Sequence, residues 1–179
     1  MKIQIIGYSG SGKSNLAWRL ASHYNIPCLH LDGVQFYGNW DIRDDDEQNN
    51  IVRDFLAKND NWVIDGNYSR IAPERFTQSD ITIFLNYNRF YCYRKARQRA
   101  IENRGKIRYS CPCPEKFDKE FQRWILWDSR IAHCRKRHKI NLNRTNGQKL
   151  MFRNLRQLNK WLKSNNIEHR MLYDANLEK

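Results

Sequence analysis

The chain has little proline and glycine, an odd number of cysteines and no long apolar run. Its 179 residues include 4 prolines and 8 glycines, and no Pro/Gly/Ser-rich linker or internal repeat divides them. We therefore expect one domain over residues 1–179. No apolar stretch approaches the roughly 20 residues of a membrane span, and an apolar strand starting at residue 2 leaves no room for a leader peptide. The 5 unpatterned cysteines are typical of a reduced, cytoplasmic protein.

Acidic residues are scarce in the middle of the chain. The formal net charge is +13, and residues 86–144 hold 17 Lys/Arg against 5 Asp/Glu. A basic block of this kind could face nucleic acid, or it could close over a polyanionic nucleotide. Charge alone does not choose between these two partners.

The first 14 residues contain a complete phosphate-loop pattern. The motif G-x-x-x-x-G-K-[ST] is matched by Gly7, Tyr8, Ser9, Gly10, Ser11, Gly12, Lys13 and Ser14. An apolar run at residues 3–6 precedes it, and apolar residues at helical spacing follow it. This strand–loop–helix context favours a nucleotide-binding loop over a glycine-rich turn without a ligand.

Each residue type in the loop suits a phosphate ligand. The glycines let the backbone N–H groups approach an anion, and the helix that opens at Lys13 directs its positive dipole end towards that anion. Lys13 would reach the outer phosphates of ATP, and the Ser14 hydroxyl would be a ligand of Mg²⁺. We therefore expect ATP and Mg²⁺ as cofactors.

The rest of the sequence alternates strand-like and helix-like segments, which is typical of a doubly wound parallel sheet. Strands are predicted at residues 26–32, 61–66, 80–86 and 138–143, and helices at 44–60, 88–103 and 115–136. A closing helix is predicted from the apolar residues Leu150, Met151, Leu155, Leu158 and Leu162. The acidic residues at 44–47 are interpreted as charges at a helix N-terminus. Trp124 and Trp127 are interpreted as core or interface residues.

Four segments together resemble a known family. With the phosphate loop, the stretches HLDGVQF, WVIDGNYSR and CPEKFDKEFQRWILW are similar to the DNA topology modulation (FlaR-like) proteins, which are P-loop relatives of adenylate kinase. The resemblance runs from residue 1 to about 162. It implies a three-layer α/β sandwich with a five-stranded parallel sheet, of the P-loop nucleoside/nucleotide-kinase type.

The resemblance also implies roles for two aspartates that follow strands. Asp65 corresponds to the aspartate of adenylate kinases that holds Mg²⁺ directly or through water; its alternative role is a turn residue before Gly66. Asp32 lies where related kinases place a carboxylate that binds the phosphate acceptor, and it could orient or deprotonate a hydroxyl. Its alternative role is also that of a turn residue.

The resemblance also implies a role for the basic block at residues 86–144, because adenylate-kinase relatives have a lid after the fourth strand. An acceptor-side segment is expected at about 33–60 and a lid at about 104–118, with Arg104 and Arg108 stabilising charge during phosphate transfer. Arg97 and Arg144 are predicted to contact the nucleotide, Arg144 because it would follow the last strand, where relatives hold the adenine ring.

These features favour an ATP-dependent kinase acting on an unidentified small-molecule acceptor, as a monomer or homodimer. One alternative is a nucleic-acid-binding ATPase or DNA topology modulator, which the basic block and the family name favour but no known DNA-binding motif supports. Another is a regulatory nucleotide-binding protein with little turnover.

Overall fold

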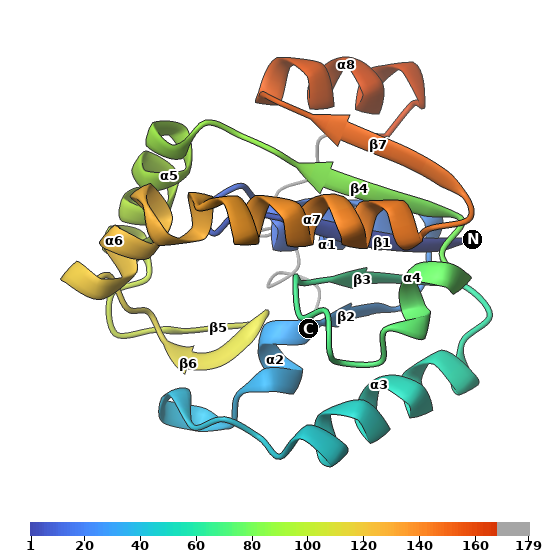
Figure 1. Cartoon of the computed structure of the whole chain (residues 1–179), viewed down its shortest axis with the longest axis horizontal. Coiled ribbons are helices and arrows are strands. Elements are labelled where there is room, and N and C mark those ends of the chain that lie inside the picture. The colour runs from blue at the N-terminus through green and yellow to red at the C-terminus, as the bar shows by residue number, and fades with distance from the viewer. Residues whose placement is uncertain (168–179) are drawn as a thin grey trace.

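The structure, a computed structural model, describes residues 1–167 and contains one five-stranded parallel sheet (Figure 1). The strand order is β2-β3-β1-β4-β7, and every adjacent pair is parallel. The strands are β1 (Lys2–Gly7), β2 (Cys28–His30), β3 (Trp62–Asp65), β4 (Ile81–Leu85) and β7 (Gln148–Phe152). A separate antiparallel hairpin consists of β5 (Ile107–Arg108) and β6 (Cys111–Pro114).

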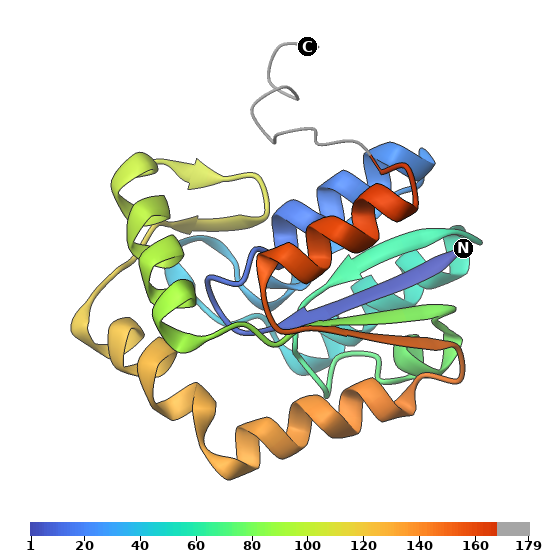
Figure 2. The ribbon, with the colours of Figure 1, turned by 90° about the horizontal axis from the view of Figure 1, so that it is seen from above.

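Helices cover both faces of the sheet, as the predicted three-layer sandwich requires. Figure 2 shows α1 and α8 together on one face and α7 on the other. The helices are α1 (Lys13–Tyr24), α2 (Leu31–Gln35), α3 (Asp45–Lys58), α4 (Glu74–Gln78), α5 (Arg89–Glu102), α6 (Lys119–Leu126), α7 (Ala132–Arg144) and α8 (Leu155–Ser164). Two 3₁₀ turns, η1 (Gly38–Trp40) and η2 (Asp128–Arg130), join some of them. The predicted three-layer α/β sandwich with a five-stranded parallel sheet is confirmed.

The sheet forms because its central strands are apolar on both faces. Ile3, Ile5 and Ile6 of β1 are almost completely buried, as are Ile83 and Leu85 of β4. Parallel strands covered by helices on both sides are expected to be continuously apolar in this way. The apolar side of α1 packs on them, so the chain enters and leaves the phosphate loop through rigid, buried elements.

The helix predictions at 44–60 and 88–103 are confirmed by α3 and α5. The Asp44 carboxylate accepts a hydrogen bond from the Asp46 backbone N–H at 2.9 Å, so the acidic run does begin a helix. The Asn88 side chain caps α5 in the same way, accepting from the Phe90 N–H at 2.8 Å. Both helices therefore begin where a short polar side chain satisfies a free N–H group.

The predicted last strand at 138–143 is wrong, because these residues belong to α7. His138, Asn141 and Leu142 are its buried residues, and this three-to-four-residue spacing is helical. The last strand is β7 instead. Leu150 and Met151, predicted in the closing helix, lie in this strand, and the helix itself begins at Leu155.

The predicted long helix at 115–136 is also wrong, because it is broken into α6, η2 and the start of α7. α6 begins after Asp118, whose carboxylate accepts from the Phe121 N–H at 2.8 Å. It ends at Leu126, and the next residue, Trp127, has non-helical backbone angles. Trp124 and Trp127 are 43% and 58% exposed, so neither is a core residue of the described chain.

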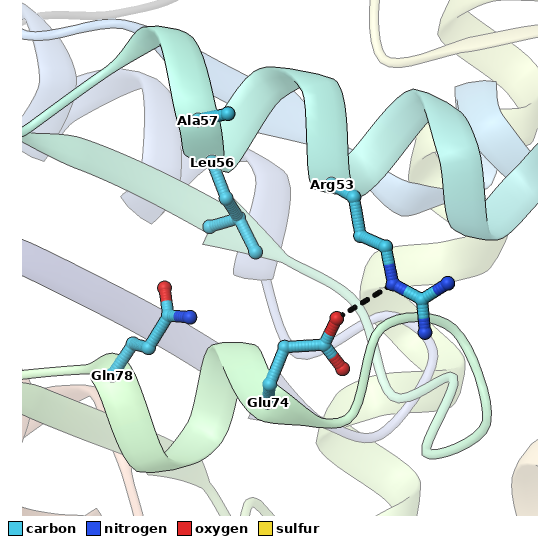
Figure 3. Close-up of a pocket in the computed structure, with 5 residues that line it drawn as sticks. All are labelled: Arg53, Leu56, Ala57, Glu74 and Gln78. Carbon is cyan, nitrogen blue, oxygen red and sulfur yellow. Dashed lines mark hydrogen bonds and ion pairs between the residues drawn. The ribbon is translucent and has the colours of Figure 1, made fainter.

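The two ends of the sheet differ in what they offer a ligand. At the end where the strands begin, a hollow of about 210 Å³ lies between α3 and α4 (Figure 3). Two of the residues that line it form an ion pair, between Arg53 Nε and Glu74 Oε1 at 2.8 Å. The other end carries the phosphate loop and the carboxyl ends of β2 and β3, and the polar side chains gather there. Within residues 1–167, no helix is long and apolar enough to cross a bilayer.

Candidate active site

The phosphate loop is held against α5 by a contact that only glycine allows. A β-carbon at Gly10 would lie 2.2 Å from the Cys92 carbonyl oxygen and 3.2 Å from Ala96 Cβ. Gly10 also has a φ of +79°, in the left-handed region. Gly12 has a similar φ of +89°, but a β-carbon there would meet nothing within 4 Å.

This difference predicts unequal effects of two alanine substitutions. Gly10→Ala should lower the free energy of unfolding by about 2–5 kcal/mol, because backbone strain contributes roughly 1–2 kcal/mol and overpacking roughly 1–3 kcal/mol. Gly12→Ala should lower it by about 1–2 kcal/mol from backbone strain alone. Urea unfolding of both variants measures the difference, and equal losses would contradict the proposed packing of the loop on α5.

The start of the loop is fixed by a side chain from the segment after β3. The Gly7 N–H donates to Asn67 Oδ1 at 2.9 Å, and Asn67 Nδ2 donates to the Gly7 carbonyl at 2.7 Å. Buried Arg75 supports this segment by donating to Gln4 Oε1 at 3.0 Å and to the Tyr68 carbonyl at 2.7 Å. The motif containing Asn67 was recognised in the sequence, but this role was not.

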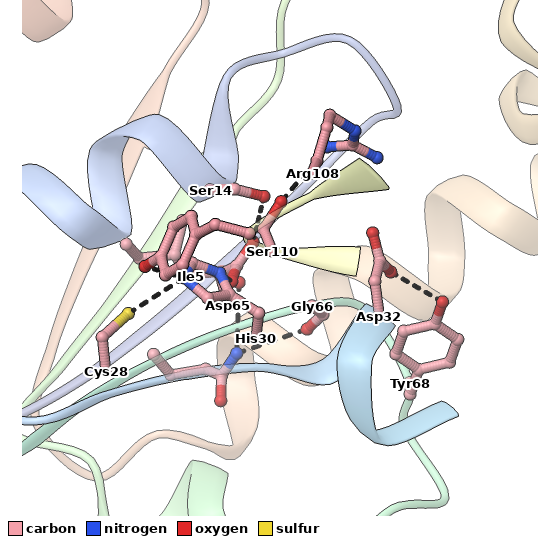
Figure 4. Close-up of polar contacts among 12 residues, drawn as sticks. Ile5, Ser14, Cys28, His30, Asp32, Asp65, Gly66, Tyr68, Arg108 and Ser110 are labelled. Carbon is pink, nitrogen blue, oxygen red and sulfur yellow. Dashed lines mark hydrogen bonds and ion pairs between the residues drawn. The ribbon is translucent and has the colours of Figure 1, made fainter. Parts of the chain in front are cut away.

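Ser14 and Asp65, the two predicted Mg²⁺ ligands, are in direct contact. The Ser14 hydroxyl donates to Asp65 Oδ2 at 2.9 Å, and Asp65 is 4% exposed at the end of β3 (Figure 4). A hydroxyl and a carboxylate are hard oxygen donors of the kind that Mg²⁺ prefers. The donor set beside the phosphate loop therefore fits this ion.

The other oxygen of Asp65 is hydrogen-bonded to His30, a residue that the sequence analysis did not select. His30 Nδ1 contacts Asp65 Oδ1, and His30 Nε2 contacts the Tyr109 hydroxyl. Burial disfavours the charged imidazolium, but the contacts with the Asp65 carboxylate and then with Cys28 outweigh it and raise the pKa of His30 to about 10. β2 and β3 align His30 with Asp65 in register, so the pairing follows from the sheet.

The charges of Asp32 and Asp65 act on Lys13, which belongs to the loop motif and opens α1. Its Nζ donates to the Tyr8 carbonyl at 3.3 Å. Burial lowers the pKa of Lys13, and the nearby charges of Asp32 and Asp65 act in the opposite direction. The positive end of α1, Lys13 and the two aspartates thus occupy one corner of the sheet.

Asp32 is close to its predicted place but not at the end of a strand. β2 stops at His30, and Asp32 lies in the first turn of α2. It accepts a hydrogen bond from the Tyr68 hydroxyl at 2.7 Å (Figure 4). Burial raises the pKa of Tyr68, and the Asp32 charge adds to that effect, so the tyrosine stays a donor. Asp32 is half-buried and keeps its second oxygen for another partner.

The β5–β6 hairpin occupies part of the predicted lid segment and packs on the acceptor-side segment. The Trp40 N–H donates to Cys113 Sγ at 3.3 Å, and the Cys113 thiol donates to the Tyr37 carbonyl at 3.3 Å. Below the hairpin, Glu115 pairs with Arg108 Nε at 2.6 Å and with Arg99 Nη2 at 2.8 Å. The hairpin therefore brings Arg108 and Arg99 together around one buried carboxylate.

The remaining predicted arginines lie elsewhere. Arg97 and Arg104 are exposed, on α5 and in the turn after it. Arg144 ends α7, and its Nη1 donates to the Ser69 carbonyl at 3.4 Å. The residues that follow the true last strand are Arg153 and Asn154, so these occupy the sheet position that the sequence analysis gave to Arg144.

One arginine beside the loop was missed. The Arg130 guanidinium lies 3.4 Å from the centre of the Tyr8 ring and donates to the Tyr87 carbonyl at 2.7 Å. The Tyr8 ring also packs on His138, whose pKa burial and then the charge of Lys13 lower to about 4. Arg130 is one of many cations in the basic block, and no sequence pattern distinguishes it.

Comparisons with known proteins give limited similarity. No family model matches the chain. An adenylate kinase of Bifidobacterium longum (strain NCC 2705) is 32% identical over 93 residues, which is 41% of this chain and 50% of the adenylate kinase. The match thus spans about half the length of that relative.

Two solved structures align with most of the chain at low identity. An uncharacterized protein of Eubacterium ventriosum ATCC 27560 has a TM-score of 0.49 at 19% identity, over 95% of this chain and 100% of its own. Shikimate kinase of Bacteroides thetaiotaomicron has a TM-score of 0.48 at 16% identity, over 92% of this chain and 95% of its own. By sequence, part of the chain is similar to an adenylate kinase.

Proposed function

We propose that this protein is an ATP-dependent kinase that transfers the γ-phosphate of MgATP to a small molecule. The observation that carries the proposal is the contact of Ser14 with Asp65 beside Lys13, at the edge where Asp32 also lies. Phosphate transfer needs the phosphates to be held, a metal ligand set and a positioned acceptor, and this edge offers all three.

The nucleotide half of the site uses the loop and its neighbours. The loop N–H groups and Lys13 would bind the phosphates, and Ser14 and Asp65 would hold Mg²⁺. When bound, Mg²⁺ supplies positive charge that neutralises the phosphate oxygens. Arg108 and Arg104 are the candidate cations for the transferred group, and Arg97 is a candidate contact of the nucleotide.

The acceptor half of the site would use Asp32. With Tyr68 fixing one carboxylate oxygen, the other would accept the proton of an acceptor hydroxyl. The acceptor O–H bond breaks, its oxygen bonds to the γ-phosphorus, and the bond from that phosphorus to the bridging oxygen breaks to leave ADP. The proton ends on Asp32, from which solvent removes it.

An ADP-release screen tests the proposal. Purified protein with MgATP is offered nucleotides, nucleosides, sugars and polyols, and at least one class should raise ADP release well above the rate with water alone. Tight MgATP binding without any active acceptor would instead favour the regulatory nucleotide-binding protein.

A nucleic-acid-binding ATPase is a second candidate because of the surface of α7. This helix has no acidic residue, and its exposed cations are Arg135, Lys136, Arg137, Lys139 and Arg144. Including DNA in the same screen tests it. Salt-sensitive DNA binding that survives Lys13→Ala, together with DNA-stimulated ATP hydrolysis in the unmodified protein, would favour this candidate over the kinase.

A further inference from the structure

An unbroken chain of side-chain contacts joins the turn of the β5–β6 hairpin to the phosphate loop. The Tyr109 hydroxyl contacts His30 Nε2, and His30 Nδ1 contacts Asp65 Oδ1. Asp65 Oδ2 accepts from the Ser14 hydroxyl at 2.9 Å. Four residues from four separate segments are thus linked through the carboxylate assigned to Mg²⁺.

We propose that His30 and Tyr109 are positioning residues that couple docking of the hairpin to the orientation of the Asp65 carboxylate. This inference rests on the proposed function, in which Asp65 and Ser14 hold Mg²⁺. It assigns a purpose to the hairpin turn beyond covering the site: the docked turn sets the metal-binding oxygen.

The contacts that link Tyr109, His30 and Asp65 differ in how firmly their residues are held. His30 and Asp65 are 8% and 4% exposed, and they are aligned by β2 and β3. Tyr109 is 62% exposed and lies in the turn of a hairpin whose strand β5 has 2 residues. The contact between Tyr109 and His30 is therefore the link that can be made and broken while the sheet stays intact.

The two carboxylate oxygens of Asp65 have different partners. The His30 Nδ1–H donates to Oδ1, which fixes the rotation of the carboxylate and leaves Oδ2 facing Ser14. Partners of metal ligands commonly orient them in this manner. Without its bond to Tyr109, His30 Nε2 keeps its contact with Cys28 Sγ at 3.5 Å but loses its hydroxyl partner, so the imidazole ring is held less firmly.

The hairpin also carries a cation to the site. Arg108 immediately precedes Tyr109, and its guanidinium pairs with Glu115 at 2.6 Å. In the proposed coupling, docking of one turn would set the position of Arg108 and fix Asp65 in the same event. Because coupling is reciprocal, Mg²⁺–nucleotide bound at Asp65 must in turn stabilise the docked hairpin.

Conservative variants separate the two halves of the link. Tyr109→Phe removes one hydroxyl from an exposed ring, so the fold should be retained. His30→Asn keeps an amide nitrogen near the position of Nδ1 but has no counterpart of Nε2. Tyr93→Phe is the matched control, because it also removes a tyrosine hydroxyl. Tyr93 lies on α5, and its hydroxyl donates to Gln122 Oε1 at 3.0 Å.

Two measurements test the proposal. Amide exchange over residues 107–114, without any ligand, should be faster in Tyr109→Phe and His30→Asn than in Tyr93→Phe. Calorimetry with a non-hydrolysable ATP analogue at increasing Mg²⁺ should give a half-saturating Mg²⁺ concentration raised about 3–10-fold in Tyr109→Phe. Removing the partner of Asp65 altogether, in His30→Ala, should raise it about 10–100-fold.

The outcomes distinguish this inference from the proposed function. If Tyr109→Phe matches Tyr93→Phe in exchange, or loosens the hairpin without changing the Mg²⁺ dependence, the coupling is disproved while the kinase assignment stands. If the unmodified protein binds no Mg²⁺–nucleotide, the proposed function fails and the coupling to a metal fails with it. A half-saturating Mg²⁺ concentration raised as much in the control Tyr93→Phe as in Tyr109→Phe would also overturn the proposal, because the effect would not be specific to the hairpin turn.

Discussion

Replacing Lys13 with alanine should weaken MgATP binding by at least about 10–100-fold while the chain remains folded. A hydrogen bond between a charged ammonium and a phosphate contributes roughly 1.5–3 kcal/mol, which corresponds to this loss. Burial already lowers the pKa of Lys13, so the ammonium is held in a desolvated place where a second negative partner should bind strongly. Calorimetric titration with MgATP measures the change.

Lys119→Ala is the matched control for this prediction. Lys119 is the first residue of α6, as Lys13 is of α1, but it is exposed and lies away from the loop. The Lys119→Ala protein should bind MgATP with the affinity of the unmodified protein. Unchanged MgATP affinity in a folded Lys13→Ala protein would remove the basis for assigning the loop to a nucleotide.

Asp32→Asn should slow phosphate transfer by about 10²–10⁴-fold, the usual contribution of a positioned general base. The amide cannot accept the acceptor proton as a carboxylate does, yet it has nearly the same size and can still accept from Tyr68. MgATP affinity should change little, because the phosphates are held on the other side of Lys13. Single-turnover transfer with the acceptor found in the screen, combined with MgATP calorimetry, separates the two effects.

The controls for Asp32 are one distant and one adjacent substitution. Asp54→Asn changes an exposed carboxylate on α3 and should have no effect on transfer. Tyr68→Phe frees the carboxylate from its hydrogen bond and should slow transfer less than Asp32→Asn does. A transfer rate in Asp32→Asn equal to that of the unmodified protein would leave Asp32 as a turn residue of α2.

The sequence predicted the parts of the site that depend on local rules. The phosphate loop needs glycines and a lysine at fixed spacing between a strand and a helix, and that pattern is complete from Gly7 to Ser14. Asp65 was predicted from its place after a strand together with the resemblance of the segment around it to adenylate kinases. The contact between Asp65 and Ser14 then follows from the position of β1 beside β3.

The parts that were missed depend on tertiary contacts. His30 acts through its pairing with Asp65, 35 residues away, and no local pattern marks that pairing. Arg130 looks like any other cation of the basic block until the fold places it over Tyr8. The segment 138–143 alternates polar and apolar residues as a strand would, but burial of His138, Asn141 and Leu142 selects the helix.

The close approach of Gly10 to Cys92 has a mechanical consequence. Since the loop backbone and α5 touch with no room for a single carbon atom, the two must rotate as one body. Any swing of the 107–114 hairpin towards or away from the loop therefore has its axis beyond Glu102. Gly105, with a φ of +72° and open space around it, lies in the turn between α5 and the hairpin.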